Sequence, residues 1–93
     1  MIESFRDRRT AAVFQGRTPK GFPSDIANVV RRKLRMVDAA VQLDDLRTPP
    51  GNRLEALTDD RVGQHSIRVN DQWRVCFIWS EGNTCEVEVV DYH

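Results

Sequence analysis

The sequence predicts an α+β domain in which two N-terminal helices pack on one face of a small twisted antiparallel sheet. Two observations support this. In the first half, apolar residues recur every three or four positions, as on one side of a helix. After the turn-forming residues 48–52 the apolar period becomes two, which is typical of strands. The chain has 93 residues, so we expect a single domain, 1–93, with one core.

The first half is predicted to hold a short strand and two helices. Residues 2–5 are apolar enough for a short strand, and a helix is expected over 7–15, ended by Gly16. The longer helix is expected over 24–42, with Ser24 as its N-cap. Its buried stripe consists of apolar residues at helical spacing: Ile26, Val30, Leu34, Val37 and Val41.

The second half is predicted to be all sheet. Strands are expected at 54–57, 64–69, 73–79 and 84–91, because apolar and polar residues alternate there. Polar or turn-forming residues separate these runs. A meander of antiparallel strands follows from the short connections between them.

The apolar positions also set the register of the sheet. Directly opposed residues share a face, so the apolar sets of neighbouring strands must pair. A three-residue loop, Asn70–Gln72, opposes Ile67 to Val75 and Arg68 to Arg74. The two arginines are therefore expected on one face, directed away from the helices.

The same reasoning applies to the last hairpin. Phe77 is expected opposite Val87, which sets Val90 across from Arg74 and leaves Tyr92 diagonal to that arginine. By the same alternation Cys76 and Cys85 point to opposite faces, so no disulfide is expected between them.

Composition excludes several classes of function. No apolar run approaches the ~20 residues that cross a bilayer, and the N-terminus does not read as a signal peptide, so we expect a cytoplasmic protein. The cysteines lack histidines at ligand spacing, so no zinc site is expected.

Charge is unevenly spread along the chain. Residues 1–36 hold nine Lys or Arg against three acids, whereas residues 37–93 hold five against eleven. Arg31, Arg32 and Arg35 fall off the apolar stripe and are expected to face water. This basic half fits either a polyanion-binding face or ordinary solvated helix surfaces.

The outer face of the predicted sheet suits a phosphodiester. Arg68 and Arg74 can form bidentate hydrogen bonds with phosphate oxygens. Tyr92 can donate a hydrogen bond or stack on a base, and the terminal His93 can transfer a proton. The alternative is that both arginines are ordinary outward-facing strand residues. His65 is expected to be a partly buried strand residue with a local hydrogen bond.

Four motifs resemble those of HigB-type toxins in the RelE/ParE toxin–antitoxin superfamily. They are MIESF at 1–5, GNRLEAL at 51–57, SIRVNDQWRVCF at 66–77 and VEVVDYH at 87–93. The resemblance spans nearly the whole chain and implies the RelE-like fold. It also implies a toxin that cleaves messenger RNA in the ribosome by attack of the 2′-OH, without a metal or other cofactor.

The resemblance assigns roles to residues of the last strands. Arg74 is implied as the cation that stabilises the phosphate, and Tyr92 and His93 as stacking or proton-transfer groups. Asp91 is implied to orient the chain end or a neighbouring residue.

Two positions depart from some members of the superfamily, which carry a histidine and a lysine where this chain has Glu55 and Thr58. Glu55 can act as a base if Arg61, Arg68 or Arg74 neutralises it. Thr58, Arg61 and Arg68 are expected to contact RNA. These changes favour a weak or specialised ribonuclease.

The resemblance also implies partners. They are a cognate helix-turn-helix antitoxin of the HigA type, the ribosome with its messenger RNA, and operator DNA reached only through the antitoxin. No membrane partner is expected. Two alternatives stay open: a toxin that binds a protein target such as gyrase, and a catalytically weak toxin that acts mainly in an autoregulatory complex with its antitoxin.

Overall fold

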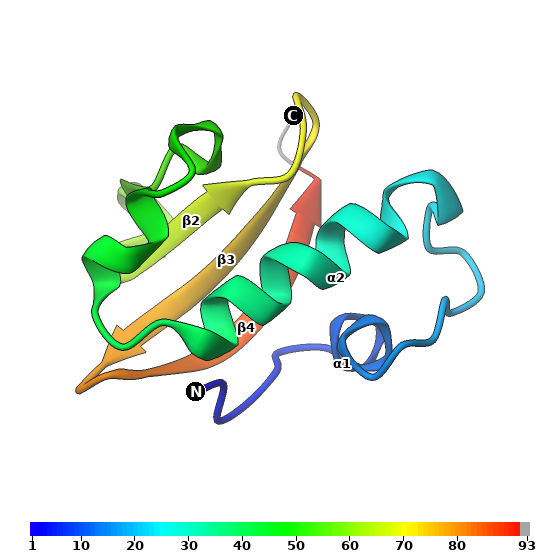
Figure 1. Cartoon of the computed structure of the whole chain (residues 1–93), viewed down its shortest axis with the longest axis horizontal. Coiled ribbons are helices and arrows are strands. Elements are labelled where there is room, and N and C mark those ends of the chain that lie inside the picture. Colours follow the sequence, from blue (N-terminus) through cyan, green and yellow to red (C-terminus); the bar gives the residue numbers. More distant parts are fainter. Residues whose placement is uncertain (92–93) are drawn as a thin grey trace.

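The computed structural model describes residues 1–91 and shows two α-helices beside a four-stranded antiparallel sheet (Figure 1). The strands lie in the order β1-β2-β3-β4, which is a meander. The elements in chain order are α1 (Arg8–Phe14), α2 (Ser24–Ala39), η1 (Leu43–Arg47), η2 (Pro50–Asn52), β1 (Glu55–Ala56), η3 (Asp59–Arg61), β2 (Gln64–Arg68), β3 (Trp73–Ser80) and β4 (Asn83–Asp91).

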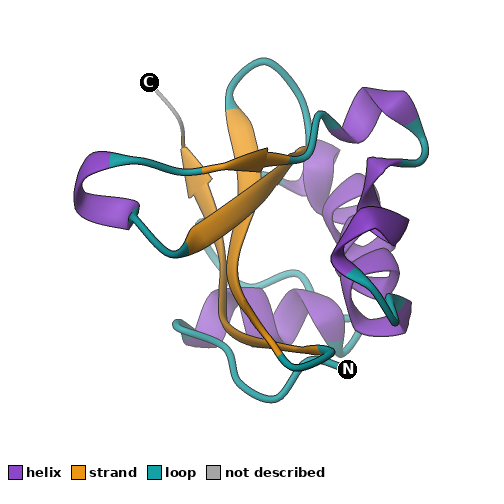
Figure 2. Ribbon diagram, turned by 90° about the vertical axis from the view of Figure 1, so that its left-hand side faces the viewer, coloured by secondary structure: helices purple, strands orange, loops and turns teal. Residues whose placement is uncertain are grey.

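The sheet separates an apolar core from a polar surface. Helix α2 lies across one face, which we name the inner face, and the short η3 helix lies on the other side, the outer face (Figure 2). Helix α1 packs against α2 and β4. Apolar side chains of α2 and the inner face form the core, among them Val30, Leu34, Val37, Ile67, Val75, Phe77 and Val87, all fully buried.

Helix α1 begins and ends as the sequence predicts. The carboxylate of Asp7 accepts from the backbone N–H of Thr10, which caps the first turn. Gly16 follows the last turn with φ +97°, a left-handed conformation that glycine adopts without strain. Arg31 is half-buried, and its Nε donates to the carbonyl of Val13 at 2.8 Å. The expectation that Arg31 simply faces water is therefore wrong.

Helix α2 is shorter than predicted at its C-terminus. It ends at Ala39, and Val41 is 74% exposed, so Val41 does not belong to the buried stripe. The reason is local: Gln42 caps η1 in a reciprocal capping box, which diverts the chain from the helical path. Ser24 is the first helical residue and not the N-cap, a position that Pro23 occupies without a side-chain hydrogen bond.

The N-terminal segment borders β4 without forming the strand predicted at 2–5. Among the described residues it forms only two isolated parallel bridges, Ile2 with Thr84 and Phe5 with Val87. The backbone N–H of Ile2 also donates to Asp38 of α2 at 2.9 Å. This segment protects much of the β4 edge, which would otherwise present unpaired backbone groups.

The register of β2 against β3 is confirmed. Ile67 lies opposite Val75 and Arg68 lies opposite Arg74. The side chain of Asn70 accepts from the backbone N–H groups of Gln72 and Trp73, which stabilises the three-residue loop between the strands.

The last hairpin departs from simple alternation because β4 contains a β-bulge. Cys76 pairs with Glu88, yet Ile78 pairs with Cys85, so Glu86 and Val87 together oppose Phe77. Glu86 has φ +54° at this point. Beyond the bulge, the inward and outward positions of β4 are exchanged. Cys85 therefore lies on the outer face with Cys76. The prediction that the two cysteines point to opposite faces is wrong. Both cysteines are free thiols.

Within residues 1–91, the structure contains no helix that is both long and apolar enough to cross a membrane.

Candidate functional site

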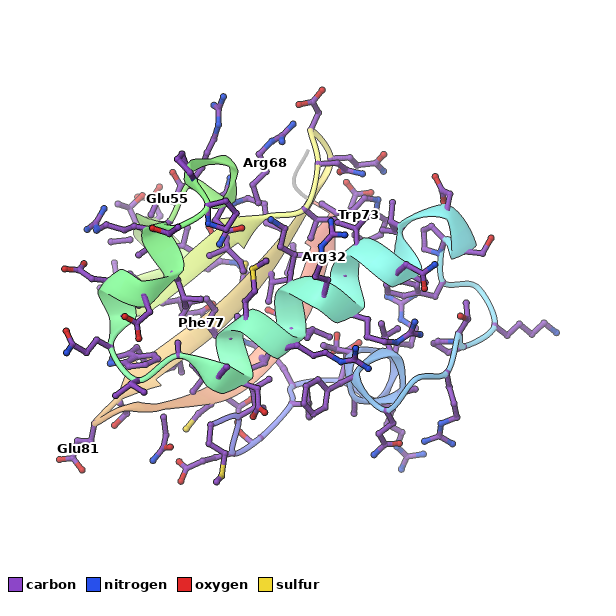
Figure 3. The ribbon with its side chains drawn as sticks, in the orientation of Figure 1. Arg32, Glu55, Arg68, Trp73, Phe77 and Glu81 are labelled. Carbon is purple, nitrogen blue, oxygen red and sulfur yellow. The ribbon has the colours of Figure 1, made fainter. Side chains whose placement is uncertain are left out.

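Charged and polar side chains gather on the outer face, around the adjacent parts of β1, β2 and β3. The register places Glu55 opposite Ser66, and Arg68 opposite Arg74, so all four project from the same side. In Figure 3, Glu55 and Arg68 lie toward the end of the sheet opposite the hairpin tip at Glu81. We name this group the outer-face cluster; it consists of Glu55, Arg61, Ser66, Arg68, Arg74, Cys76 and Glu88.

Arg74 has the least exposed charged side chain of the cluster, and hydrogen bonds fix its position. Its Nε donates to Ser66 Oγ at 2.7 Å and its Nη2 donates to the carbonyl of Arg53 at 2.8 Å. A carboxylate oxygen of Glu55 lies 3.6 Å from Nη2. The Arg74 side chain is only 12% exposed, whereas that of Glu55 is 51% exposed. The guanidinium is thus oriented by two neutral acceptors and has a solvent-accessible counter-ion beside it.

The carbonyl of Arg53 reaches Arg74 because the backbone turns sharply before β1. Arg53 is the C-cap of η2 and has φ +46°, in the left-handed region. A non-glycine residue there carries conformational strain, which persists where surrounding contacts stabilise it. Here one of those contacts is the hydrogen bond from Arg74 to this carbonyl.

Two arginines face each other across the β2–β3 ladder. Like charges directly opposite are destabilising in a sheet, so the Arg68–Arg74 pair lowers stability unless anions compensate it. Asp71 forms an ion pair with Arg68, and Glu55 lies beside Arg74. Both acids are exposed to solvent, Asp71 almost completely and Glu55 by about half.

Arg61 adds a third cation to the cluster. It reaches from η3 across the outer face, where its Nη1 donates to Glu88 at 2.7 Å and to Gln64 at 3.0 Å. Glu88 also lies 3.9 Å from Arg6. Arg61 therefore links η3 to β4, and one side of the cluster is closed by this ion pair.

Cys76 lies at the centre of these charges and is fully buried. Burial is the main reason that the pKa of its thiol is raised above the ordinary value. Arg61 and Arg74 act to lower that pKa, whereas Glu88 and Glu55 act to raise it. Cys76 is thus a neutral packing group, because a reactive cysteine needs exposure and a lowered pKa.

The other predicted site residues lie in different places. Thr58 is exposed and precedes η3, with its carbonyl accepting from the backbone N–H of Arg61. Asp91 lies opposite Trp73, on the pleat of the inner face, and accepts from the side chain of Gln72 at 3.0 Å. Asp91 therefore projects away from Arg74. The remaining two predicted residues, Tyr92 and His93, lie outside the described residues.

His65 belongs to the inner side of the sheet. Its ring stacks on Phe77 with centroids 6.4 Å apart, and it is partly buried as expected. Its Nδ1 is buried without a hydrogen-bond partner in residues 1–91, so the expected local hydrogen bond is absent there.

Ser66 and the carbonyl of Arg53 are the two groups that sequence reasoning missed. Pleat parity could have found Ser66, because it stands two residues before Arg68 on the same strand and so shares its face. No sequence signal points to the Arg53 carbonyl, because its direction depends on a left-handed backbone at an arginine.

The described residues contain no group of three or more histidine, cysteine or acidic side chains that could hold a metal ion.

The arrangement of helices and sheet is that of the RelE-like toxins. The YoeB–YefM complex from Staphylococcus aureus contains a chain that superimposes with a TM-score of 0.58 at 12% identity, covering all of this chain and 98% of that one. At this identity the likeness concerns the fold alone.

The sequence defines the family more narrowly. The chain belongs to the RelE-like toxins of type II toxin–antitoxin systems, HigB family, whose family model matches residues 3–93. It is 52% identical over 60 residues to Toxin HigB-1 of Vibrio cholerae, a match that covers 64% of this chain and 63% of that protein. An uncharacterized protein of Haemophilus influenzae is 38% identical over 98% of this chain and 90% of its own length. Endoribonuclease HigB of Proteus vulgaris is 28% identical over the full length of both.

Proposed function

We propose that this protein is an endoribonuclease toxin that cleaves messenger RNA on the ribosome and so stops translation and growth. The observation that carries the proposal is the preorganised Arg74, held by Ser66 and the Arg53 carbonyl on the outer face. Membership of the HigB family and the name of the Proteus relative support it. Fixed cations aimed at developing negative charge are usually the largest contribution to catalysis of such reactions.

The proposed reaction uses a nucleophile that the RNA supplies. The 2′-OH loses its proton and attacks the adjacent phosphorus, and the bond to the 5′ oxygen breaks. The products are a 2′,3′-cyclic phosphate and a 5′-OH that takes up a proton. The protein must supply a base, a cation for the non-bridging oxygens and an acid for the leaving oxygen.

In this proposal Arg74 is the cation and Glu55 changes partner. When a phosphate oxygen binds Nη2 of Arg74, it displaces the Glu55 carboxylate that lies 3.6 Å away in the free chain. The released carboxylate is then available as the base for the 2′-OH. Tyr92 and His93 serve as stacking and proton-transfer groups, as the motif at the end of the chain implies, and Asp91 orients the loop at Gln72.

The partners follow from the family. We propose a cognate helix-turn-helix antitoxin of the HigA type, with operator DNA bound only through it. Arg61, Arg68 and Thr58 contact the RNA beside the cleaved bond. The ribosome presents the message, because the site itself carries little unbalanced positive charge.

The test is to map RNA 5′ ends in cells that express the protein. We expect cuts in translated messages at a fixed phase of the codon, lost when Arg74 is replaced by alanine. Arg35→Ala, an exposed change on α2, is the matched control and should leave the cuts intact. Unchanged cuts and toxicity in Arg74→Ala would refute the role of this arginine. DNA damage without RNA cuts would indicate a gyrase-type target instead.

A further inference from the structure

A second basic feature lies outside the outer-face cluster, beside α1. Helix α1 and the loop that follows it form an open pocket of about 410 Å³, which we name the arginine pocket. Its walls come from Arg8, Arg9, Ala12, Arg17, Thr18 and Pro19. No acidic residue is among them. Side chains of three arginines therefore contribute to the lining of the hollow, together with Ala12 and Pro19, and the lining is mostly apolar.

Arg31 of α2 holds the backbone on either side of the loop that lines the arginine pocket. Its Nε donates to the carbonyl of Val13 at 2.8 Å and its Nη2 donates to the carbonyl of Arg17 at 3.3 Å. The loop therefore follows one path between the end of α1 and the start of α2. Because these bonds order the backbone at Val13 and Arg17, an anion needs little rearrangement of the protein to bind.

The cations of the two basic regions differ in how they are balanced. In the outer-face cluster each arginine has a carboxylate: Arg61 with Glu88, Arg68 with Asp71, and Arg74 with Glu55. In the arginine pocket, the Nε of Arg9 is 3.9 Å from a carboxylate oxygen of Asp7, which is long for an ion pair. Arg8 and Arg17 make no ion pair within residues 1–91. The pocket thus has charge available for a partner, whereas the cluster must exchange its own acids first.

We propose that the arginine pocket binds the sugar–phosphate backbone of RNA outside the segment that is cleaved. Guanidinium forks match phosphate oxygens, and neutralising phosphates releases counter-ions, which is the main source of affinity for nucleic acids. A neutral protein with a neutralised cleavage site needs such a region to hold RNA. The identification of RNA as the polyanion rests on the proposed function; the anion site itself rests on the pocket.

The test measures binding and not cleavage. The probe is a fluorescent 2′-O-methyl RNA oligonucleotide, which the protein cannot cleave because the nucleophile is blocked. The full-length double variant Arg8→Ala/Arg17→Ala is compared with Arg35→Ala/Arg47→Ala, which removes the same charge from other exposed positions. Affinity is measured between about 50 and 200 mM salt, the range over which phosphate contacts have their largest effect. Thermal unfolding verifies that each variant is folded.

We expect the pocket variant to bind at least about tenfold more weakly at low salt. The slope of log K against log salt should decrease by about 1.4, since each phosphate contact to single-stranded RNA contributes ~0.7. The control pair should keep the wild-type slope. Equal slopes for the two double variants would overturn the proposal, and so would a loss of antitoxin binding with RNA binding intact, which would assign the pocket to an acidic protein. Absence of codon-phased cuts would refute the proposed function without changing these slopes.

Discussion

The two faces of β3 show how one strand can serve stability and a site separately. On the inner face Val75 and Phe77 are fully buried in the apolar core under α2. On the outer face Arg74 and Cys76 are nearly or fully buried as well, but among charged groups and hydrogen-bond acceptors. Burial alone therefore does not distinguish the core from the site.

The difference lies in what each neighbour contributes. Apolar contacts on the inner face have no direction, so their contribution to stability follows the area removed from water. The contacts of Arg74 are directional and fix a cation at one position. We therefore expect substitutions on the inner face to lower the free energy of unfolding, and those on the outer face to lower activity in a chain that remains folded.

The largest effect should come from the inner face. Phe77→Ala removes the largest fully buried side chain and should lower the free energy of unfolding by about 3–5 kcal/mol. Urea denaturation of the purified protein measures this. Ile78→Ala, the next residue along and only half-buried, is the control and should be milder. An equal loss from Ile78→Ala would mean that the two faces contribute alike to stability.

Next comes the cation of the outer face. Arg74→Ala should reduce the single-turnover rate of message cleavage on ribosomes by about 10²–10³, the usual effect of removing one such donor. Its free energy of unfolding should fall by about 1–3 kcal/mol, less than for Phe77→Ala, because Ser66 and the Arg53 carbonyl lose their charged donor. Arg74→Lys keeps the charge without the fork, so it should recover only part of the rate. A large loss of stability with wild-type cleavage would reverse the assignment of the faces.

A smaller effect should come from Ser66, which acts through Arg74. Ser66→Ala removes the acceptor 2.7 Å from Nε and should slow cleavage about tenfold, the scale of one hydrogen bond to a charged group. In an Arg74→Ala background the same change should have almost no effect, because the positioned group is already absent. Thr84→Val, which removes a buried hydroxyl on β4, is the control for a general change in the sheet. Additive losses in the double variant would exclude positioning.

The sequence predicts the parts of the fold that depend on alternation. Ile67 against Val75 places Arg68 and Arg74 on the outer face, because a shift of one residue would expose the apolar set. The end of α2 is predicted incorrectly, since Val41 continues the apolar spacing while the capping box at Gln42 stops the helix. Side chain–backbone hydrogen bonds of this kind leave little trace in a hydrophobic pattern.

The candidate site is predictable to a similar extent. Arg68 and Arg74 are identified correctly as neighbours, since parity and register determine them, whereas Glu55 is singled out only through the family resemblance. The face on which Cys85 lies is predicted incorrectly. The β-bulge that moves it needs a left-handed residue at Glu86, and no glycine in the sequence marks that position. Contacts made by backbone carbonyls, such as that of Arg53, depend on conformation and therefore require coordinates.

The smallest effect concerns pH and also separates the two faces. The pKa of Cys76 is raised by burial, so the folded protein keeps this proton when the unfolded chain loses it near its ordinary value of 9.0. The unfolded state then binds fewer protons, and the stability that Cys76 contributes should be present below this pH and decline above it. Comparison of wild type with Cys76→Ala by denaturation at about pH 7 and pH 10 measures this as a shrinking difference in the free energy of unfolding. Val75→Ala, on the inner face, removes no titratable group, so its difference from wild type should stay constant. If the difference between Cys76→Ala and wild type also stayed constant, the thiol would be as accessible to solvent in the folded protein as in the unfolded chain.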